Sequence, residues 1–245
     1  MTHNHSITPS WLDPDSSTVD FPDVELAMLE PNGLLAVGGA LSERWLLSAY
    51  RHGVFPWYGP GQPILWWAPD PRLVLYPKRL HVSRSLAKVI RNGGFELTLD
   101  TAFSAVISGC AESRPGQSGT WITQEMRQAY IDLHHSGHAH SVECWYAGDL
   151  VGGLYGVAVG RVFFGESMFA RRSNASKVAF VALVRQLDRW GFRLIDCQVY
   201  TDHLASLGAS GIARRTFNGI LSRECDLPGP AGGWQFDESP SVLSP

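Results

Sequence analysis

The chain has 245 residues, which is enough for one large domain or two modest ones. Hydrophobic residues make up 44% of the chain, which excludes wholesale disorder, and a formal net charge of −3 argues against a protein that coats nucleic acid through bulk charge. The four cysteines are widely spaced without a C-x-x-C pair, so we expect neither a zinc site nor a disulfide framework and favour a reducing, cytoplasmic setting. We also expect no signal peptide and no membrane span.

The first part of the chain predicts a small domain after a loose start. Residues 1–30 are polar and rich in proline, so we expect a loosely ordered segment there. Residues 31–72 then predict a small N-terminal α/β domain. Its helix covers 42–52, where apolar residues recur at helical spacing and Gly53 follows, and a short strand begins at Ile64.

The second part, 73–225, predicts a larger mixed (α+β) domain. A short strand at 73–76 is followed by a basic helix over 83–92 and a strand over 95–100. Further elements are expected as helices over 101–111 and 124–136 and as a meander of strands over 139–145, 150–159 and 161–169.

The last elements set up a parallel strand pair. A helix begins after Asn174 and ends at Gly191, and a strand covers 193–200. A crossover helix of this length implies that this strand lies parallel to an earlier one. Helices near 202–207 and 214–223 follow, and the Pro-, Gly- and Ser-rich residues 226–245 predict a flexible tail.

Two polar side chains stand out in the strand 193–200. Alternation places Ile195, Cys197 and Val199 on one face, which we take as the core. Asp196 and Gln198 then lie about 7 Å apart on the other face. They either face solvent on an ordinary strand or form a ligand site at the carboxyl end of a parallel strand.

A carboxylate, Glu166, lies within the apolar strand 161–169. Buried carboxylates are usually paired, so an ion pair with Arg171 or Arg172 is one interpretation. The other is that Glu166 contacts a cationic or amine ligand, with Gly165 allowing that ligand to approach the backbone closely.

Basic residues gather before and on the helix 83–92, at the start of the helix that follows Asn174, and at Arg214 and Arg215. These clusters are either phosphate-binding patches or solvated helix faces. A helix start also favours a phosphate through its free N–H groups. The residues of the first two clusters that we assign to nucleic-acid binding are Lys78, Arg79, Arg84, Lys88, Arg171, Arg172 and Lys177.

The four histidines His134, His135, His138 and His140 do not match a zinc-ligand pattern, so we assign them a surface role. We expect no metal and no cofactor. The glycines Gly152, Gly153 and Gly156 lie inside a strand, so they do not form a dinucleotide-binding turn.

Several long motifs, read in order between about residues 30 and 220, carry a family resemblance. They closely resemble those of the bacterial leucyl/phenylalanyl-tRNA–protein transferases. The motifs include Pro31-Asn32-Gly33-Leu34-Leu35, Gly53-Val54-Phe55-Pro56-Trp57, Trp66-Trp67-Ala68-Pro69-Asp70-Pro71-Arg72, Gly119-Thr120-Trp121-Ile122-Thr123, Phe164-Gly165-Glu166-Ser167-Met168-Phe169, Asn174-Ala175-Ser176-Lys177 and Leu194-Ile195-Asp196-Cys197-Gln198.

The resemblance implies a small N-terminal domain and an acetyltransferase-like (GNAT) domain over 73–225. It implies transfer of Leu or Phe, with some Met, from aminoacyl-tRNA to the N-terminal Arg or Lys of a protein. This step feeds the bacterial N-end rule degradation pathway. We expect a monomer without membrane association.

The resemblance also implies site residues. Asp196 and Gln198 take the central catalytic roles, with Gln198 orienting the attacking amine and passing polarisation to Asp196. Asp196 or Glu166 pairs with the cationic side chain of the acceptor. The side chain of the transferred amino acid is expected to meet Trp57, Trp121, Leu154, Phe163, Leu183 and Leu187. Gly165 and Glu166 are expected near the aminoacyl ester.

Two alternatives come from other functional classes. One is an acetyl-CoA-dependent GNAT acetyltransferase, although the stretch 171–176 lacks the glycines of a pyrophosphate loop. The other is a non-catalytic RNA- or peptide-binding module, which would not require Asp196 and Gln198 beside an apolar pocket.

Overall fold

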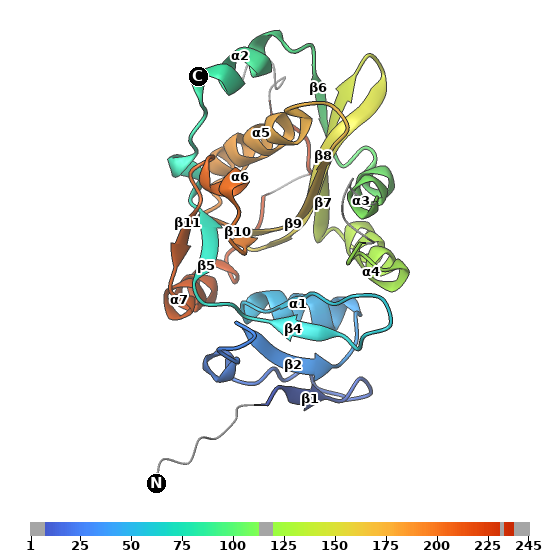
Figure 1. Ribbon diagram of the computed structural model, residues 1–245, viewed down its shortest axis with the longest axis vertical. Helices are drawn as coiled ribbons and strands as arrows, with labels where there is room; N and C mark the ends of the chain where they lie inside the picture. The colour runs from blue at the N-terminus through green and yellow to red at the C-terminus, as the bar shows by residue number, and fades with distance from the viewer. Residues whose placement is uncertain (1–7, 113–119, 231–232, 238–245) are drawn as a thin grey trace.

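The structure is a computed structural model that describes residues 8–112, 120–230 and 233–237. The described residues form two sheets, which we call the smaller and the larger sheet. Figure 1 shows the smaller sheet stacked below the larger one, with a helix between them. In chain order the first elements are β1 (Ser10–Leu12), the 3-10 helix η1 (Val24–Leu26), β2 (Leu34–Gly38), α1 (Glu43–Arg51), β3 (Phe55–Pro56) and β4 (Leu65–Trp67).

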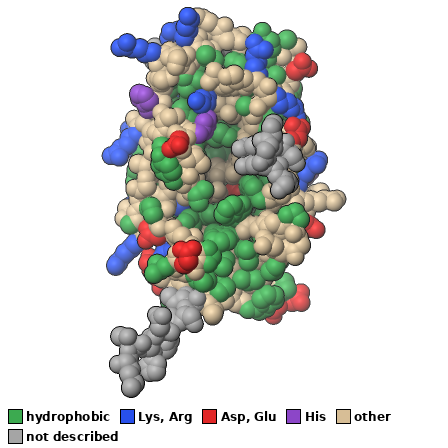
Figure 2. Space-filling model, viewed as in Figure 1, with side chains coloured by type: hydrophobic (Ala, Val, Ile, Leu, Met, Phe, Trp, Pro, Cys, Tyr) green, Lys and Arg blue, Asp and Glu red, His purple; other side chains and the backbone are tan. Residues whose placement is uncertain are grey.

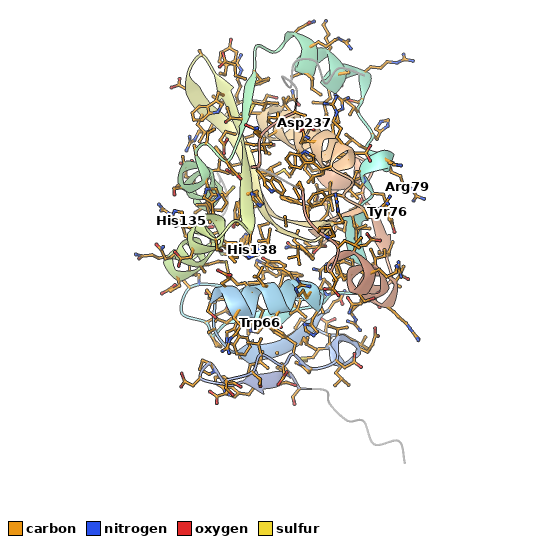
Figure 3. The ribbon with its side chains drawn as sticks, turned by 180° about the vertical axis from the view of Figure 1, so that it is seen from behind. Trp66, Tyr76, Arg79, His135, His138 and Asp237 are labelled. Carbon is orange, nitrogen blue, oxygen red and sulfur yellow. The ribbon has the colours of Figure 1, made fainter. Side chains whose placement is uncertain are left out.

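The smaller sheet has the strand order β1-β2-β4-β3, and α1 lies between it and the larger sheet. Aromatic residues hold this part together. Trp45 of α1 stacks on Trp66 of β4, and Phe21 meets both rings edge-on. Trp66 is fully buried, and Figure 3 shows it in the lower part of the molecule, next to α1. Burial of such large rings is the main stabilising contribution in a unit of this size.

The expectation of a loose segment over 1–30 is wrong for its described part, residues 8–30. β1 pairs in parallel with β2, and η1 begins at an Asp23 cap whose carboxylate accepts a bond from the Glu25 N–H. Phe21 anchors the segment by packing edge-on against both tryptophans. Residues 1–7 lie outside the described residues.

The larger sheet contains the remaining strands in the order β11-β5-β10-β9-β8-β7-β6. β6 to β9 form an antiparallel meander, and β10 lies parallel to β9, as the crossover helix predicted. The bounds are β5 (Arg72–Leu75), the 3-10 helix η2 (Pro77–Arg79), α2 (Arg84–Asn92), β6 (Glu96–Leu99), α3 (Phe103–Ala111), α4 (Gln124–His135), β7 (Ala139–Tyr146), β8 (Asp149–Val159), β9 (Val162–Ala170), α5 (Ala175–Arg189), β10 (Leu194–Gln198), α6 (Asp202–Ala205), β11 (Ser210–Ile212) and α7 (Arg214–Glu224). The fold is therefore mixed α/β, as expected.

Two apolar clusters fill the two faces of the larger sheet. One face packs on α1, α3 and α4, and Tyr50 of α1 contacts Phe164 of β9 there. The other face packs on α5, which buries Leu183, Val184 and Leu187. Both faces of β9 and β10 are thus covered, which explains why a carboxylate on either strand is buried.

The expectation of a flexible tail over 226–245 is also wrong in part. The ring of Trp234 stacks on His140 at 3.6 Å between ring centroids. The Asp237 carboxylate accepts bonds from the Gln186 amide and the Trp190 indole, which ties the tail to the end of α5 (Figure 3). Residues 231–232 and 238–245 lie outside the described residues.

Histidine burial differs from the sequence expectation at one position. His140 is buried and pairs with Asp100 at 2.7 Å, so it has no surface role. His135 and His138 lie at the end of α4 and just beyond it, at the side of the molecule (Figure 3). Across the part of the chain that the structure describes, no helix has the length and apolar character needed to cross a membrane.

Candidate active site

Asp196 of β10 forms a buried ion pair with Arg72, the first residue of β5. The Arg72 Nε donates to Oδ1 at 2.8 Å, and Nη2 donates to Oδ2 at 2.7 Å. The guanidinium lies between the rings of Phe55 and Phe217, and the Asp196 side chain has no exposed surface. Two parallel charge-assisted bonds fix this carboxylate firmly. Both carboxylate oxygens of Asp196 are thus engaged by Arg72, although the residue is among those that line the cavity described below.

Gln198 ends β10 in a strained conformation. Its φ is +61°, in the left-handed region that non-glycine residues seldom adopt. Pairing with β5 shifts register between Asp196 and Gln198, and the Gln198 N–H donates to Asp196 Oδ1 at 2.9 Å. Val199 follows with 45% exposure, so it is not the core residue that regular alternation predicted. Because the shift ends the regular strand, the Arg72–Asp196 pair controls where the Gln198 side chain points.

The Gln198 side chain meets Glu166 instead of Asp196. Its Nε2 donates to Glu166 Oε1 at 3.0 Å. The expected route of polarisation from the Gln198 amide to Asp196 is thus not formed, because only the backbone of Gln198 contacts Asp196. With Nε2 bound to a carboxylate, the amide oxygen of Gln198 points away from Glu166 and is available to accept a bond.

Glu166 lies at an irregularity of β9, where Tyr155 pairs with Ser167 but Gly156 pairs with Gly165. The unpaired residue directs its side chain towards α1 and α4. Oε1 accepts a bond from the Tyr50 hydroxyl and Oε2 accepts one from the Tyr130 hydroxyl, both at 2.8 Å. Bulges are frequent next to active sites because they redirect one side chain.

The pKa of Glu166 is raised to about 7, chiefly by burial and also by the charge of Asp196, and the hydrogen bonds from Tyr50, Tyr130 and Gln198 oppose this rise. Its side chain is only 9% exposed. A carboxyl group that titrates near neutral pH can take up and return a proton under working conditions.

The expected ion pair of Glu166 with Arg171 or Arg172 is not formed. Arg171 pairs with the Glu112 carboxylate and donates to the Leu150 carbonyl at 3.0 Å. The Arg172 guanidinium lies 3.6 Å above the Tyr146 ring. Both arginines follow the end of β9 and are exposed, so tyrosines and not arginines hold the Glu166 carboxylate.

A cavity of about 720 Å³ opens beside Glu166 and Gln198, at the carboxyl ends of β9 and β10. Its wall includes Leu154, Phe163 and Phe180, which are apolar, and α6 borders it through Leu204. Figure 2 shows hydrophobic side chains gathered around a hollow in the middle of this face. The size and the mostly apolar wall with a few polar groups at one end suit a small-molecule moiety.

The cavity includes four of the seven residues expected to bind the transferred aminoacyl group, namely Trp121, Leu154, Phe163 and Gly165. The other three do not line it. Trp57 is 46% exposed and packs edge-on against Trp67. Leu183 and Leu187 are buried where α5 packs on the sheet, and the same helix contributes Phe180 and Ser176, which lie closer to its start, to the cavity.

Five of the seven basic residues expected to hold nucleic acid lie on α5 or on the two elements η2 and α2 that pack against it. Lys78 and Arg79 of η2 and Arg84 and Lys88 of α2 are exposed, and both elements pack against α5. Arg79 lies over the Tyr76 ring, and Figure 3 shows both at the edge of the molecule. Lys177 is half-buried in the first turn of α5. The loop after η2 contacts the end of α6 through the bond from His81 N–H to the Leu207 carbonyl, so this basic surface reaches the rim of the cavity.

Comparison with known families gives a match over most of the chain. The family model described as "Leucyl/phenylalanyl-tRNA protein transferase" matches residues 74–222, and the model for the N-terminal domain of the same family matches residues 39–70. The chain belongs to the leucyl/phenylalanyl-tRNA–protein transferase family. Relatives named leucyl/phenylalanyl-tRNA–protein transferase include one from Azotobacter vinelandii, 60% identical over 87% of this chain and 95% of its own length. Another, from Chromohalobacter salexigens, is 60% identical over 91% of this chain and 87% of its own length.

A solved GCN5-related N-acetyltransferase from Kribbella flavida is 16% identical, with a TM-score of 0.37 over 67% of this chain and 58% of that one. The two transferase family matches meet between residues 70 and 74, where the chain leaves the smaller sheet and begins β5 at Arg72. We propose that this point divides the chain into two domains.

Proposed function

We propose that this transferase moves Leu or Phe, and less Met, from aminoacyl-tRNA to the N-terminal Arg or Lys of acceptor proteins in the N-end rule pathway. The observation that carries the proposal is the apolar cavity that ends at Glu166 and Gln198, in a chain that belongs to this family. We further propose that the protein acts as a cytoplasmic monomer. Its four cysteines are widely spaced in the sequence and buried, which suits a reducing compartment.

The cavity wall explains the choice of amino acid. Leu154, Phe163 and Phe180 offer apolar contacts and no charge, so Leu and Phe side chains gain by burial there. An apolar pocket separates side chains that differ by one methylene by only about 1–3 kcal/mol. Transfer of Met beside Leu and Phe follows from this weak discrimination.

The chemistry makes modest demands, because an aminoacyl ester is already activated. The amine nitrogen of the acceptor attacks the ester carbonyl carbon, and the bond from that carbon to the ribose oxygen of the tRNA breaks. The nitrogen loses one proton and the ribose oxygen gains one, so no proton is consumed overall. An α-amino group has a pKa of about 8, so part of it is neutral at working pH, and positioning supplies much of the rate.

The roles of the three polar residues follow from their contacts. The amide oxygen of Gln198 accepts a hydrogen bond from the attacking amine, because its Nε2 is engaged by Glu166. Asp196 holds the Gln198 backbone in its strained conformation. Both Asp196 oxygens are engaged by Arg72, and the Glu166 oxygens already accept bonds from Tyr50, Tyr130 and Gln198, so neither carboxylate is assigned to the cationic side chain of the acceptor.

Exposed cations on η2 and α2, together with Lys177, are proposed to hold phosphates near the acceptor end of the tRNA. They lie beside α5 and reach the α6 rim of the cavity, so a bound strand could place its terminal ester in the cavity. Arg171 is occupied by Glu112, so we expect a smaller contribution from it.

One assay tests the proposal against its alternatives. The protein is incubated with Leu-tRNA or with acetyl-CoA, together with peptides that begin with Arg, Lys or Ala, and the peptide masses are read. The proposal expects a mass increase of one Leu on the Arg and Lys peptides only. Acetylation, or no change in mass, would support the acetyltransferase or the binding module instead.

A further inference from the structure

We propose that Glu166, Tyr50 and Tyr130 form a closed ring of hydrogen bonds that stores the proton released by the attacking amine. This inference rests on the proposed function for the source of that proton, but the ring itself is a property of the free protein. The proposal assigns a role to Tyr50 and Tyr130. These residues lie on helices that are distant in the sequence from the strands that carry the other site residues.

The ring has three contacts between oxygens. Tyr50 lies 2.8 Å from Glu166 Oε1, Tyr130 lies 2.8 Å from Oε2, and the two hydroxyl oxygens lie 2.6 Å apart. All three side chains are buried. A contact as short as 2.6 Å between oxygens requires a hydrogen between them.

The ionised ring lacks one hydrogen. With a carboxylate, the two tyrosines donate their hydrogens to Oε1 and Oε2, and none remains for the contact between Tyr50 and Tyr130. Two hydroxyl oxygens then face each other at short range in a site without water exposure. Such an unmade buried contact is costly, so the ring favours the uptake of one proton.

The protonated ring is complete. The carboxyl group donates from Oε2 to Tyr130, Tyr130 donates to Tyr50, and Tyr50 donates to Oε1, which also accepts from Gln198 Nε2. The reverse direction also closes the ring, with the proton on Oε1. A proton that arrives at Oε1, the oxygen beside Gln198, therefore needs only a rotation of hydroxyl groups to be shared.

The surrounding groups support a neutral carboxyl. The charge of Asp196 on β10 raises the pKa of Glu166, and Arg72 on β5 pairs with Asp196. Tyr155 on β8 packs against Tyr130, and burial followed by the charges of Glu166 and Cys110 raises its pKa. Burial and the charge of Glu166 hold the pKa values of both Tyr50 and Tyr130 well above their usual range, so the tyrosines keep their hydrogens.

The proton balance in the transfer is closed. As the N–C bond forms, the amine gives one proton to the Glu166 carboxylate and completes the ring. As the bond between carbon and ribose oxygen breaks, the carboxyl group returns that proton to the oxygen. Tyr50 and Tyr130 are positioning residues in this scheme, since they touch Glu166 and not the substrate.

Carbon-13 NMR of the free protein tests the ring. Labelled Glu and Tyr are used, Glu166→Gln assigns the Glu166 carboxyl signal, and the spectra are followed from about pH 5 to about pH 9. We expect the Glu166 signal to titrate near 7, with the hydroxyl-bearing carbons of Tyr50 and Tyr130 moving at the same midpoint. A Glu166 signal that stays that of a carboxylate over the whole range, or tyrosine signals that do not follow it, would overturn the ring.

Tyr50→Phe and Tyr130→Phe then test its role, and Tyr155→Phe is the matched control. Tyr155 is equally buried and touches Tyr130, but within the described residues its hydroxyl has no hydrogen-bond partner. We expect each ring variant to lower kcat by about tenfold or more, to change the pH profile of kcat, and to alter KM for aminoacyl-tRNA little. Tyr155→Phe should keep the wild-type Glu166 titration.

If both ring variants keep the wild-type pH profile, proton storage is refuted. If wild type transfers no amino acid although the ring titrates, the proposed function fails and the ring stands.

Discussion

At the scale of single residues, Arg72 and Asp196 form the ion pair that supports the candidate site. Both side chains of the ion pair are buried, and Asp196 accepts a bond from the backbone N–H of Gln198 at the turn. Removing one partner of a buried pair leaves the other charge without compensation, which typically costs about 3–5 kcal/mol.

Asp196→Asn should therefore lower the free energy of unfolding by about 3–5 kcal/mol, measured by urea denaturation. The control is Asp226→Asn, because Asp226 pairs with Arg51 on the surface, where such pairs contribute about 1 kcal/mol or less. Equal effects of the two substitutions would contradict the structural role of Asp196.

Glu166 gives a prediction with a defined sign. Its pKa in the folded protein, about 7, lies above the value of 4.5 expected when the chain is unfolded, so the folded state binds the proton more tightly. The stabilisation is complete below pH 4.5 and is lost as the pH rises through about 7. Relative to Glu166→Gln, the wild-type free energy of unfolding should fall by about 3 kcal/mol from acid to alkaline pH. A difference that is constant with pH, or that grows with it, would show that Glu166 is ionised throughout.

The polar residues of the site could be predicted, but their partners could not. Glu166 and Asp196 were noticed because carboxylates are unusual in apolar strands, and this signal is local in the sequence. Tyr50 appeared only as an apolar position of a helix, 116 residues before Glu166. Nothing in a helix pattern tells which distant strand a hydroxyl will meet, so the ring and the Arg72 pair required the folded structure.

At the scale of elements, periodicity predicted the helices α1 to α5 and the strands of the meander well. Each of these helices buries one apolar face over at least two turns, and each of these strands alternates over several residues. The short strands β3 and β11 were missed, because two or three residues carry no periodic signal. The predicted strand, 193–200, is longer than the observed strand, β10, which ends at Gln198. The turn there is held by Asp196 and not by a glycine or proline, so the sequence carries no signal for it.

Helix α7 offers a stabilising substitution. Gly219 lies in its interior, and the nearest atom to an added Cβ is Arg223 Nη1 at 4.0 Å. Gly219→Ala should raise the free energy of unfolding by up to about 1 kcal/mol, because alanine loses less backbone entropy in a helix. Gly152→Ala should destabilise instead, since its Cβ would lie 2.6 Å from the Ala175 Cβ at the start of α5. Thermal denaturation of both variants checks the pair, and a loss of stability in Gly219→Ala would contradict this description of α7.

At the scale of the whole molecule, the net charge of −3 hides a basic surface beside α5. Arg84→Ala/Lys88→Ala should weaken binding of Leu-tRNA and lower the slope of log affinity against log salt by about two, since each lost phosphate contact removes about one. Fluorescence anisotropy at several salt concentrations measures this slope. Arg223→Ala on α7, far from α2 in Figure 1, is the control and should leave it unchanged. An unaltered slope in the double variant would place the tRNA elsewhere.

The central claim is that transfer occurs at the end of the cavity where Gln198 meets Glu166. The most direct measurement is the single-turnover rate of Leu transfer from Leu-tRNA to a peptide that begins with Arg. Gln198→Ala is compared with Gln128→Ala, a glutamine exposed on α4 that bonds only to Asp132 among the described residues. We predict that Gln198→Ala slows the transfer by about 100-fold with Leu-tRNA binding retained, because the amine loses its acceptor, and that Gln128→Ala reacts at the wild-type rate. A wild-type rate in Gln198→Ala would contradict the account.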